Sequence, residues 1–430
     1  MTTRRSQRSV ASRRQFLQAS ATAATLAAAA TVSAHAAGDD RLKIGLIGCG
    51  GRGTGAAENA VRADKNCRLV ALGDAFPDKV EKCIGNLRHS LGDGVFAEKV
   101  DVPPERRFSG FDAYKQVVDA VDVVLLCTPP GFRPMHLRAA VEAGKHVFCE
   151  KPMAVDAPGV RSVLESAEIA KQKKTCLVSG FCYRYDIAKR ETVSRIHDGA
   201  IGDVVAIQCN YLTNPIWHVD RTPSMSDMEW QMRNWYYFTW LCGDFIVEQH
   251  IHSLDKAAWV MKDAYPAAAY GLGGRQVRTD PKFGHIFDHH AVVFEYENGT
   301  KLFSYCRQMR NCFNDVSDHL IGTKGSCQLM QHRIDGPHSW QFHGDAPNMY
   351  QQEHDELFAG IRAGKALNDG GFMAYSTLMG IMGRMATYTG QKVTWKQALH
   401  SKEDLMPPHL DMSASLPMPP VAKPGVTKLV

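Results

Sequence analysis

The chain has 430 residues, a length typical of two or three domains. Hydrophobic residues make up 44% of it and charged residues 22%, which is ordinary globular composition and excludes a disordered, collagenous or coiled-coil protein. The net charge of +5 disappears when residues 1–37 are set aside, because that segment carries five arginines and no Lys, Asp or Glu (5 − 5 = 0). Nothing in the charge requires a nucleic-acid or anionic-membrane partner.

Residues 1–37 have the order of an export signal. A basic segment is followed by an apolar run from Ala19 to Val32 and then by Ala34-His35-Ala36, a small-x-small cleavage site. The pair Arg13-Arg14 stands in the context that the twin-arginine pathway reads. An uncleaved membrane anchor is the alternative, but the apolar run is short for a spanning helix. We expect a periplasmic mature protein, exported by the twin-arginine pathway, with no integral membrane span after cleavage.

The twelve cysteines all follow this segment, between Cys49 and Cys327, and show no repeated C-x-x-C pair. Several lie inside apolar runs, where cysteine behaves as a small hydrophobic residue. A chain that can build a core of this size needs no disulfide framework. The spacing predicts mostly free, buried thiols and no zinc site.

The first half begins with the pattern of a dinucleotide-binding unit. The apolar run 43–47 predicts a buried strand, a helix is expected over 54–63, and a second strand over 68–72. Between the first strand and the helix lies a G-x-G-x-x-G loop, and Asp74 follows the second strand. The loop residues proposed to hold the pyrophosphate are Gly48, Gly50, Gly51, Arg52 and Gly53. Asp74 can accept hydrogen bonds from ribose hydroxyls, which favours NAD, whereas Arg52 leaves NADP open.

Strands and helices keep alternating up to Ser179. Strands are expected over 122–127, 145–149 and 175–179, with helices over 135–143 and 158–171. Ligands of open α/β sheets bind at the carboxyl ends of the strands. Asp74, Thr128 and Lys151 are therefore expected to meet in one crevice.

Lys151 is the first candidate catalytic residue. It follows a strand, within Cys149-Glu150-Lys151-Pro152, where the nicotinamide is expected. A lysine there can donate a hydrogen bond to a substrate hydroxyl and stabilise the alkoxide as hydride leaves. A surface lysine after a strand is the structural alternative. Pro152 fixes the neighbouring backbone, and a cis peptide is one option for it.

The segment 243–259 is read as one helix that carries the second set of polar groups. Glu248, His252 and Asp255 then share a face at i, i+4 and i+7, and a carboxylate one turn from a histidine can orient it as a general acid or base. His250 is assigned to packing or to the sugar. A metal on Glu248, His250, His252 and His218 is disfavoured, because histidines at i and i+2 diverge on a helix.

Aromatic residues are dense between Trp230 and Trp240, just before this segment. Aromatic faces beside hydrogen-bonding side chains suit a carbohydrate ring, although core packing explains most of them. Trp235 and Tyr236 are the two assigned to the substrate pocket.

Beyond Ser179 the pattern changes to alternating runs, as in 204–210, 290–296 and 301–307, which predict an antiparallel sheet with one covered face. The tail after Pro407 is proline-rich and irregular, and either wraps a partner subunit or is disordered. The expected division is a signal over 1–37, a Rossmann domain over 38–178, an α/β domain over 179–400 and a tail over 401–430.

Together these motifs resemble the Gfo/Idh/MocA oxidoreductase family, in its exported twin-arginine branch. The resemblance covers the glycine loop, Thr128-Pro129-Pro130 with His136, Glu150-Lys151-Pro152, Arg184-Tyr185-Asp186, the Glu248/His252/Asp255 segment and residues 376–395. It implies an N-terminal Rossmann domain and a C-terminal α/β domain with a large, mainly antiparallel open sheet, often a dimer or tetramer interface. A homo-oligomer is therefore expected.

The resemblance also assigns roles. It implies that Lys151 and His252 are catalytic, with Glu248 where the family usually has Asp. It places cofactor contacts at Thr128, Pro129, His136 and Glu150, and supports substrate contacts at Arg184, Tyr185, His250 and Asp255. Typical substrates of the family are sugars, polyols and their glycosides.

Export sharpens the functional hypothesis, since the periplasm has no dependable pool of free nicotinamide cofactor. We expect an NAD(P)-dependent oxidoreductase acting on a sugar or sugar derivative, with a tightly bound cofactor that is recycled in each turnover. A redox-neutral glycosidase that oxidises, eliminates, hydrates and re-reduces is the first alternative. A non-catalytic sugar-binding protein is the second.

Overall fold

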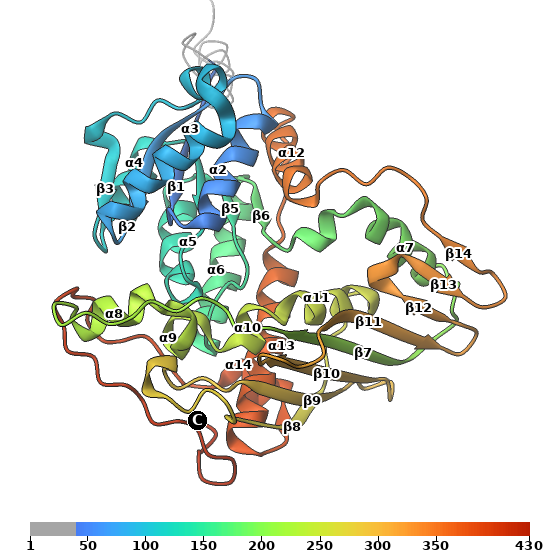
Figure 1. The fold of residues 1–430 in the computed structure, drawn as a ribbon. Coiled ribbons are helices and arrows are strands. Elements are labelled where there is room, and N and C mark those ends of the chain that lie inside the picture. Colours follow the sequence, from blue (N-terminus) through green and yellow to red (C-terminus); the bar gives the residue numbers. More distant parts are fainter. Residues whose placement is uncertain (1–39) are drawn as a thin grey trace, which may run out of the picture. The chain divides into compact units, whose positions relative to one another are not determined.

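The computed structural model describes residues 40–430, so the predicted export signal over 1–37 lies outside the described residues. The segment from Leu42 to Val430 forms one compact unit built around two sheets (Figure 1). Within the described residues, no helix has the length and apolar character needed to cross a membrane.

The first half is a parallel six-stranded sheet with the strand order β3-β2-β1-β4-β5-β6, the arrangement of a Rossmann fold. Its strands are β1 (Leu42–Ile47), β2 (Cys67–Asp74), β3 (Arg107–Ser109), β4 (Val123–Leu126), β5 (His146–Cys149) and β6 (Leu177–Ser179). They alternate with α2 (Gly51–Ala63), α3 (Pro77–Lys99), α4 (Ala113–Ala120), α5 (Arg133–Glu142) and α6 (Ala157–Lys173). The predicted strands and helices of this half are confirmed to within a few residues at their ends. α3, which turns at Gly92 where φ is +75°, α4 and the short β3 were not predicted.

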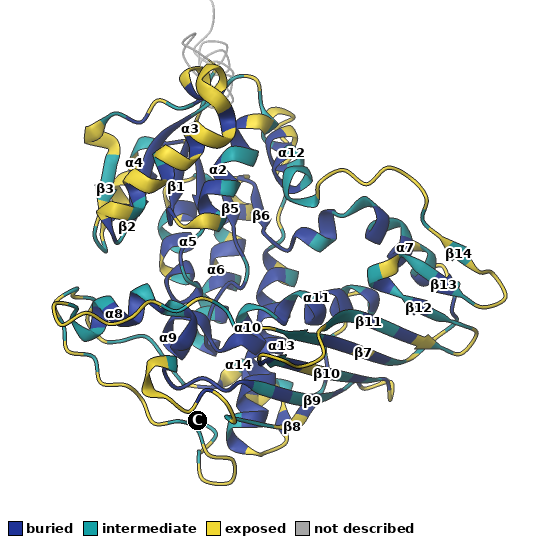
Figure 2. Cartoon of the chain, in the orientation of Figure 1, coloured by how far each residue is buried: buried dark blue, intermediate teal, exposed yellow. Residues whose placement is uncertain are grey.

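Continuous apolar runs form this sheet because helices cover both of its faces. All four residues of β4 are fully buried. One face packs against α2 and α3, and the other against α4, α5 and α6. Figure 2 shows the result, with buried strands at the centre and exposed residues on the outer sides of the helices and in the loops.

The second sheet has nine strands in the order β14-β13-β12-β11-β7-β10-β9-β8-β15. Its pairs are antiparallel except for β7 with β10, so the sheet is mixed. The strands are β7 (Val204–Thr213), β8 (Ala268–Gly274), β9 (His289–Glu295), β10 (Lys301–Gln308), β11 (Asp315–Gly322), β12 (Ser326–Gln328), β13 (Arg333–Asp335), β14 (Trp340–Gln341) and β15 (Val393–Thr394). The predicted fold class, a Rossmann domain joined to an α/β domain with a mainly antiparallel sheet, is confirmed.

Among residues 40–430, helices cover one face of this second sheet and leave the other uncovered. The alternation along β10 shows it, since Leu302, Ser304 and Cys306 are buried and Tyr305 is exposed. The helices of this half are α7 (Ile187–His197), α8 (Asp227–Arg233), α9 (Thr239–Cys242), α10 (Phe245–Glu248), α11 (Ile251–Val260), α12 (Met349–Arg362), α13 (Gly370–Thr389) and α14 (Trp395–His400). α13 is nearly all buried and lies between this sheet and α6.

α12 returns from the end of the second sheet to the Rossmann half (Figure 1). The Arg362 guanidinium pairs with Asp64 (2.7 Å), and the Gln351 side chain accepts a hydrogen bond from Asn59 on α2 (3.0 Å). Leu357 and Phe358 complete the core on that side of the first sheet. α12, which lies late in the sequence, therefore covers part of one face of the Rossmann sheet.

The tail after Pro407 contains no helix or strand, and it packs against its own chain. Leu410, Met412, Ala414 and Leu416 contact the main core. All twelve cysteines have free thiols, ten of them buried; Cys127 is half-buried and Cys312 exposed.

Candidate active site

A cleft of about 760 Å³ lies at the carboxyl ends of the Rossmann strands. Its walls contain residues from both halves of the chain: the glycine loop, the ends of β2, β4 and β5, the segment between Trp217 and Trp235, α10, α11 and the start of α12. Every cofactor residue predicted from the sequence lines it, namely Gly48, Gly50, Gly51, Arg52, Gly53, Asp74, Thr128, Pro129, His136, Glu150 and Lys151. These residues therefore lie together in one cleft, and the role of each remains a prediction.

The glycine loop leaves the space that a dinucleotide needs. A side chain at Gly53 would meet the Gly48 carbonyl oxygen at 1.9 Å, so the helix packs directly on the loop. A Cβ atom at Gly50 or Gly51 would meet nothing within 4 Å, which leaves that side of the loop open. α2 begins at Gly51 with no side-chain cap on its free N–H groups. Its positive dipole end is thus available to a phosphate, and the loop fits the pyrophosphate of a dinucleotide.

Asp74 is held in place by the backbone around it. The amide of Cys49 donates to Oδ2 (2.7 Å) and the amide of Phe76 donates to Oδ1 (3.0 Å). Burial raises the pKa of Asp74, against the lowering effect of these two hydrogen bonds. Each carboxylate oxygen has a second lone pair, so Asp74 keeps the capacity to accept from ribose hydroxyls.

Arg52 contacts two other side chains of the cleft. Its Nε lies 3.0 Å from Glu150 Oε1, and its guanidinium stands 4.7 Å from the centre of the Tyr350 ring. Glu150 is almost completely buried, and its Oε2 accepts from the Lys151 amide (3.1 Å). The Arg52–Glu150 pair therefore joins the glycine loop to the segment that carries Lys151.

His136 is packed as a neutral ring. It stacks on Tyr114 (4.4 Å between ring centres), and its Nδ1 lies 3.3 Å from the Thr128 hydroxyl. Burial, helped by the charge of Arg133, lowers the pKa of His136 to about 3. It shapes the cleft wall beside the Thr128-Pro129 turn.

Lys151 crosses the cleft to Glu248. Its Nζ donates to Glu248 Oε1 (2.9 Å) and to the Glu248 main-chain oxygen (2.6 Å), and the peptide between Lys151 and Pro152 is cis. Both side chains are only 14% exposed. An ammonium group has three N–H donors, so one remains for a ligand in the cleft.

The helix predicted over 243–259 is interrupted, and this corrects the expected alignment of its polar side chains. α10 ends at Glu248 and α11 starts at Ile251, and the His250 amide bonds to the Phe245 oxygen, five residues back. The widened turn frees the Glu248 carbonyl, which takes Lys151. The Glu248 carboxylate then faces Lys151, whereas the one-face prediction had it orienting His252.

His252 lines the cleft from the second half of the chain. Its ring stands edge-on to Tyr183, with 5.3 Å between ring centres, and its buried Nδ1 has no hydrogen-bond partner within residues 40–430. Burial, followed by the charges of Lys151 and Lys256, lowers the pKa of His252 well below its usual value. His252 is therefore a neutral imidazole at neutral pH.

Of the predicted substrate residues, only Trp235 lines the cleft. Arg184 and Asp255 pair with each other in the interior (2.9 Å), and Asp255 also accepts from Ser376 (2.7 Å). Tyr185 donates to Asp369 (2.6 Å). These three side chains are therefore held by partners in the interior and do not line the cleft.

The remaining two predicted residues bond to the interior. His250 is fully buried against Ser304 (2.6 Å), and the Tyr236 hydroxyl accepts from Gln308 (3.2 Å). Glu248, His250, His252 and His218 do not converge, and no group of possible metal ligands occurs within residues 40–430.

Sequence reasoning missed several cleft residues, including Phe76, Lys79, Trp217 and Tyr350. Phe76 and Lys79 had a usable signal, since they follow Asp74 directly. Trp217 and Tyr350 reach the cleft through the arrangement of the second half, for which the local pattern gives no sign.

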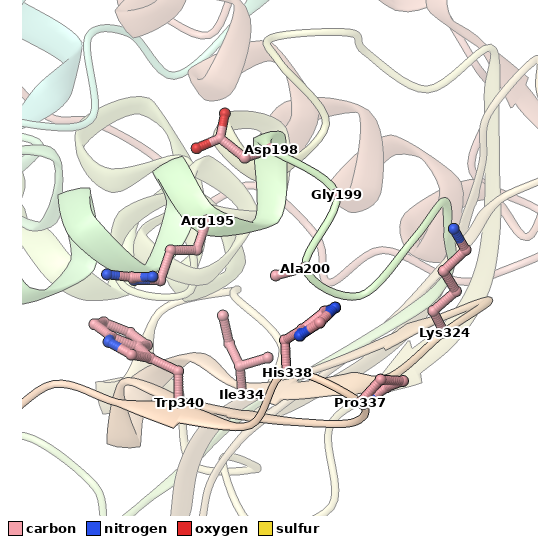
Figure 3. Close-up of a pocket in the computed structure, with 9 residues that line it drawn as sticks. All are labelled: Arg195, Asp198, Gly199, Ala200, Lys324, Ile334, Pro337, His338 and Trp340. Carbon is pink, nitrogen blue, oxygen red and sulfur yellow. The ribbon is translucent and has the colours of Figure 1, made fainter.

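A second, smaller hollow of about 410 Å³ lies at the far end of the nine-stranded sheet, between the end of α7 and the strands β13 and β14. Figure 3 shows the Arg195 guanidinium above the Trp340 ring, 4.3 Å from its centre, with Lys324 and His338 on the other side of Ile334. It contains none of the residues predicted for the site.

Comparison with known proteins agrees with this arrangement. Residues 42–181 match the Gfo/Idh/MocA model described as "Oxidoreductase family, NAD-binding Rossmann fold", and residues 190–328 match the Gfo/Idh/MocA C-terminal domain. An inositol 2-dehydrogenase of Serratia proteamaculans is 28% identical over 296 residues, covering 67% of this chain and 74% of that protein. Inositol 2-dehydrogenase 3 of Saccharopolyspora erythraea is 27% identical over 292 residues, covering 67% and 73%.

Solved structures show the same fold. A scyllo-inositol dehydrogenase from Lactobacillus casei, with bound NAD(H) and scyllo-inositol, has a TM-score of 0.61 at 20% identity, covering 83% of this chain and all of that one. An aldose-aldose oxidoreductase from Caulobacter crescentus, complexed with glycerol, has a TM-score of 0.61 at 21% identity, covering 82% and 99%. With the two family models together spanning more than half of the sequence, the chain belongs to the Gfo/Idh/MocA family and is an NAD(P)-dependent oxidoreductase.

Proposed function

We propose that the protein oxidises a hydroxyl group of a sugar or polyol, using NAD that stays bound and is recycled within the site. The observation that carries this proposal is the meeting of Lys151 and His252, from the two halves of the chain, in the same cleft as the glycine loop. A neutral imidazole and an ammonium group are the proton acceptor and the anion stabiliser that alcohol oxidation needs.

The proposed role of each residue follows from the local geometry. Bound NAD supplies the hydride acceptor. Glu248 fixes Lys151 with two hydrogen bonds, which leaves the third N–H of the ammonium for a ligand. Lys151 then donates to the substrate oxygen, and His252 takes the hydroxyl proton as the carbonyl forms. Asp74 and the glycine loop hold the cofactor, with Asp74 favouring NAD over NADP.

The lining of the cleft supports a carbohydrate or polyol as substrate. Trp217 is 45% exposed, and its ring lies 6.2 Å from that of Trp235 at an angle of 54°. Such faces accept the C–H side of a sugar ring, while Lys151 and His252 supply hydrogen bonds. The relatives named as inositol dehydrogenases support a cyclic polyol or sugar in the same position.

The test is a substrate panel on the purified mature chain without added cofactor. Mass spectrometry of the denatured protein should reveal co-purified NAD(H). Free sugars and inositols should reduce the bound cofactor, seen as absorbance at the NADH band, and a second sugar should reoxidise it. Release of the leaving group from chromogenic glycosides, with no net change in that band, would instead support the glycosidase. A protein without cofactor or spectral change would refute both and leave the binding protein.

We further propose that the chain is exported to the periplasm by the twin-arginine pathway. The support is the sequence of residues 1–37 alone. Fractionation of cells expressing the full chain should place a shortened protein in the periplasmic fraction. Replacing Arg13 and Arg14 with lysine should hold the uncut chain in the cytoplasm, and a periplasmic product from that variant would refute this route.

Self-association through the uncovered face of the nine-stranded sheet is also proposed. Leu272 on β8 is 71% exposed and pairs in register with Ala291, which pairs with Tyr305 on β10. Such a row of apolar side chains is typical of an interface. Light scattering coupled to size exclusion should give a dimer or tetramer, and Leu272→Asp should shift the mass toward one chain.

A further inference from the structure

α8 crosses the end of the cleft where the adenosine half of the dinucleotide belongs. Met232 and Arg233 line the same cleft as Asp74 and Phe76. Asp74 stands at the end of the second Rossmann strand, the position that contacts the adenosine ribose in this fold. α8 belongs to the second half of the chain, so this end of the cleft is bounded by elements from both halves.

Arg233 ties α8 to the Rossmann half. Its guanidinium lies 4.1 Å from the centre of the Phe76 ring and pairs with Asp78 at the start of α3 (3.3 Å). On its own helix it pairs with Glu229 (2.9 Å). The Arg233 side chain is 22% exposed and that of Asp78 is 57% exposed, so solvent screens this pairing, whereas the Phe76 ring under the guanidinium is buried. Arg233 thus joins α8 to the Rossmann half at one side of the cleft.

The C-terminal tail holds α8 in this position. The Gln231 side chain donates to the Leu416 oxygen (2.7 Å), and the Met228 amide donates to the Ala414 oxygen (3.3 Å). In return, the Leu416 amide and the Ser415 hydroxyl both donate to Asp227 Oδ2 (3.1 and 2.9 Å). A segment with no secondary structure of its own therefore pairs with α8 along its length.

The tail is fixed at both ends of this contact. Before it, the Leu405 amide donates to the buried carboxylate of Asp156 (2.9 Å). After it, the Gly425 amide donates to the Thr389 oxygen at the end of α13 (2.8 Å). Figure 1 shows the tail running out to α8 and coming back. A loop anchored in this way adds polar contacts to a short helix whose Met228, Trp230 and Met232 side chains are buried in the main core.

We propose that residues 411–416 hold α8 as a strap across the adenosine end of the cleft, and that Arg233 closes this strap onto Phe76 and Asp78, so that the dinucleotide is retained between turnovers. This inference rests on the retained cofactor of the proposed function and assigns that retention to a segment. Asp227 and Arg233 are then positioning residues for cofactor binding. They act by slowing dissociation, because the cofactor can leave only after the strap opens.

The test measures the dissociation of NADH from the full mature chain. The protein is loaded with NADH and mixed with excess NAD⁺ in a stopped-flow instrument, and the loss of bound-NADH fluorescence gives the rate. Arg233→Ala, which removes one ion pair and one cation–π contact across the cleft, should raise the dissociation rate about tenfold. Asp227→Ala, which removes two of the hydrogen bonds between the tail and α8 together with the Arg221 ion pair, should raise it by a similar factor.

Two matched variants serve as controls. Arg88→Ala removes the same kind of contacts, a pairing with Asp93 (3.1 Å) and a guanidinium over Phe96 (4.3 Å), at a place that does not line the cleft. Ser413→Ala alters the tail at a hydroxyl that donates to Asp411 within the tail itself (2.8 Å). Both should leave the NADH dissociation rate within a factor of two of the parent chain.

The outcomes separate the strap from the substrate proposal. Unchanged dissociation in Arg233→Ala and Asp227→Ala would overturn the strap, whatever the sugar panel gives. Faster dissociation in both, with no substrate found, would support the strap and refute the sugar chemistry. If Asp227→Ala does not fold, Asp78→Asn breaks the same bridge from an exposed position and should speed NADH release. Unaltered release in a folded Asp78→Asn would count against the bridge.

Discussion

Lys151 lies in the cleft and links the two halves of the chain. Its two hydrogen bonds to Glu248 join the Rossmann half to the second half across the cleft. A lysine on a surface would keep its rotamer freedom, whereas this one is aimed by a fixed carboxylate and a fixed carbonyl. The structural alternative considered from the sequence, an ordinary surface lysine, does not match a side chain that is only 14% exposed.

Replacing Lys151 should separate turnover from cofactor binding. Lys151→Ala removes the donor that stabilises the developing alkoxide and should lower kcat by roughly 10²–10⁴-fold. The glycine loop and Asp74 remain, so NADH affinity should change by less than about threefold, since those groups carry the phosphate and ribose contacts. Steady-state kinetics and fluorescence titration measure the two effects. Lys171→Ala, on the exposed side of α6, is the control. An unchanged kcat in Lys151→Ala would remove this residue from the mechanism.

His252 should set an acid limit that lies below the ordinary range for histidine. Burial and the charges of Lys151 and Lys256 lower its pKa, so the neutral form needed for proton uptake persists as the pH falls through 6.5. We expect kcat/KM to stay level from pH 8 to below pH 6.5 and to decline only at more acidic pH. A decline with its midpoint at or above 6.5 would contradict His252 as the base. His252→Ala should remove the pH-dependent step together with most of the rate.

At the scale of single elements, the start of α10 depends on Asp244. This residue has φ +75°, a conformation that costs a non-glycine side chain free energy, and it is fully buried. Its carboxylate accepts from the Phe245 and Phe287 amides and from the Tyr388 hydroxyl, and it lies 3.4 Å from His290. Burial acts to raise the pKa of Asp244, but His290 and these donors hold it below its usual value. The carboxylate is the centre that orients α10 and, through it, Glu248.

Asp244→Ala should therefore destabilise the fold strongly. It leaves buried donors without an acceptor, a change that costs about 3–5 kcal/mol of unfolding free energy when a buried ionic partner is lost. Tyr388→Phe removes only one hydroxyl of the same cluster and should cost about 1–2 kcal/mol. Urea denaturation of both variants gives the comparison. Equal, small effects would mean that the cluster does not position α10.

The same elements show what a sequence can and cannot predict. Strands β1, β2, β4 and β5 follow from apolar runs, and the glycine loop with Asp74 places the cofactor end of the cleft. The interruption after Glu248 could not be predicted, because the widened turn is stabilised by Lys151, which lies 97 positions earlier in the chain. Arg184 and Asp255 were assigned to the substrate by the family resemblance, yet each pairs with the other in the interior. Local patterns specify elements, whereas long-range partners decide which side chains remain free for a ligand.

At the scale of the whole molecule, buried neutral histidines link stability to pH. His136, His250 and His354 have their pKa lowered to about 3, and burial is the main cause for each. Burial likewise lowers the pKa of His285 to about 4. In the unfolded chain these residues bind protons near pH 6.5, so below that pH protons favour unfolding. Glu353 acts in the opposite sense, because burial, reinforced by Glu150, raises its pKa well above the usual value.

The unfolding free energy should therefore fall as the pH is lowered from 7.5 to 5. Each such histidine contributes at most about 1.4 kcal/mol per pH unit below 6.5, and Glu353 offsets about one of them. Urea denaturation at constant saturating NADH should give midpoints that decrease steadily over this range. The variant His354→Phe keeps the ring packing against Phe148, where the ring centres are 4.2 Å apart, and removes one titrating group. Its midpoint should depend less steeply on pH than that of the parent chain. A midpoint that is constant or rises toward pH 5 would contradict this linkage between the buried histidines and acid unfolding.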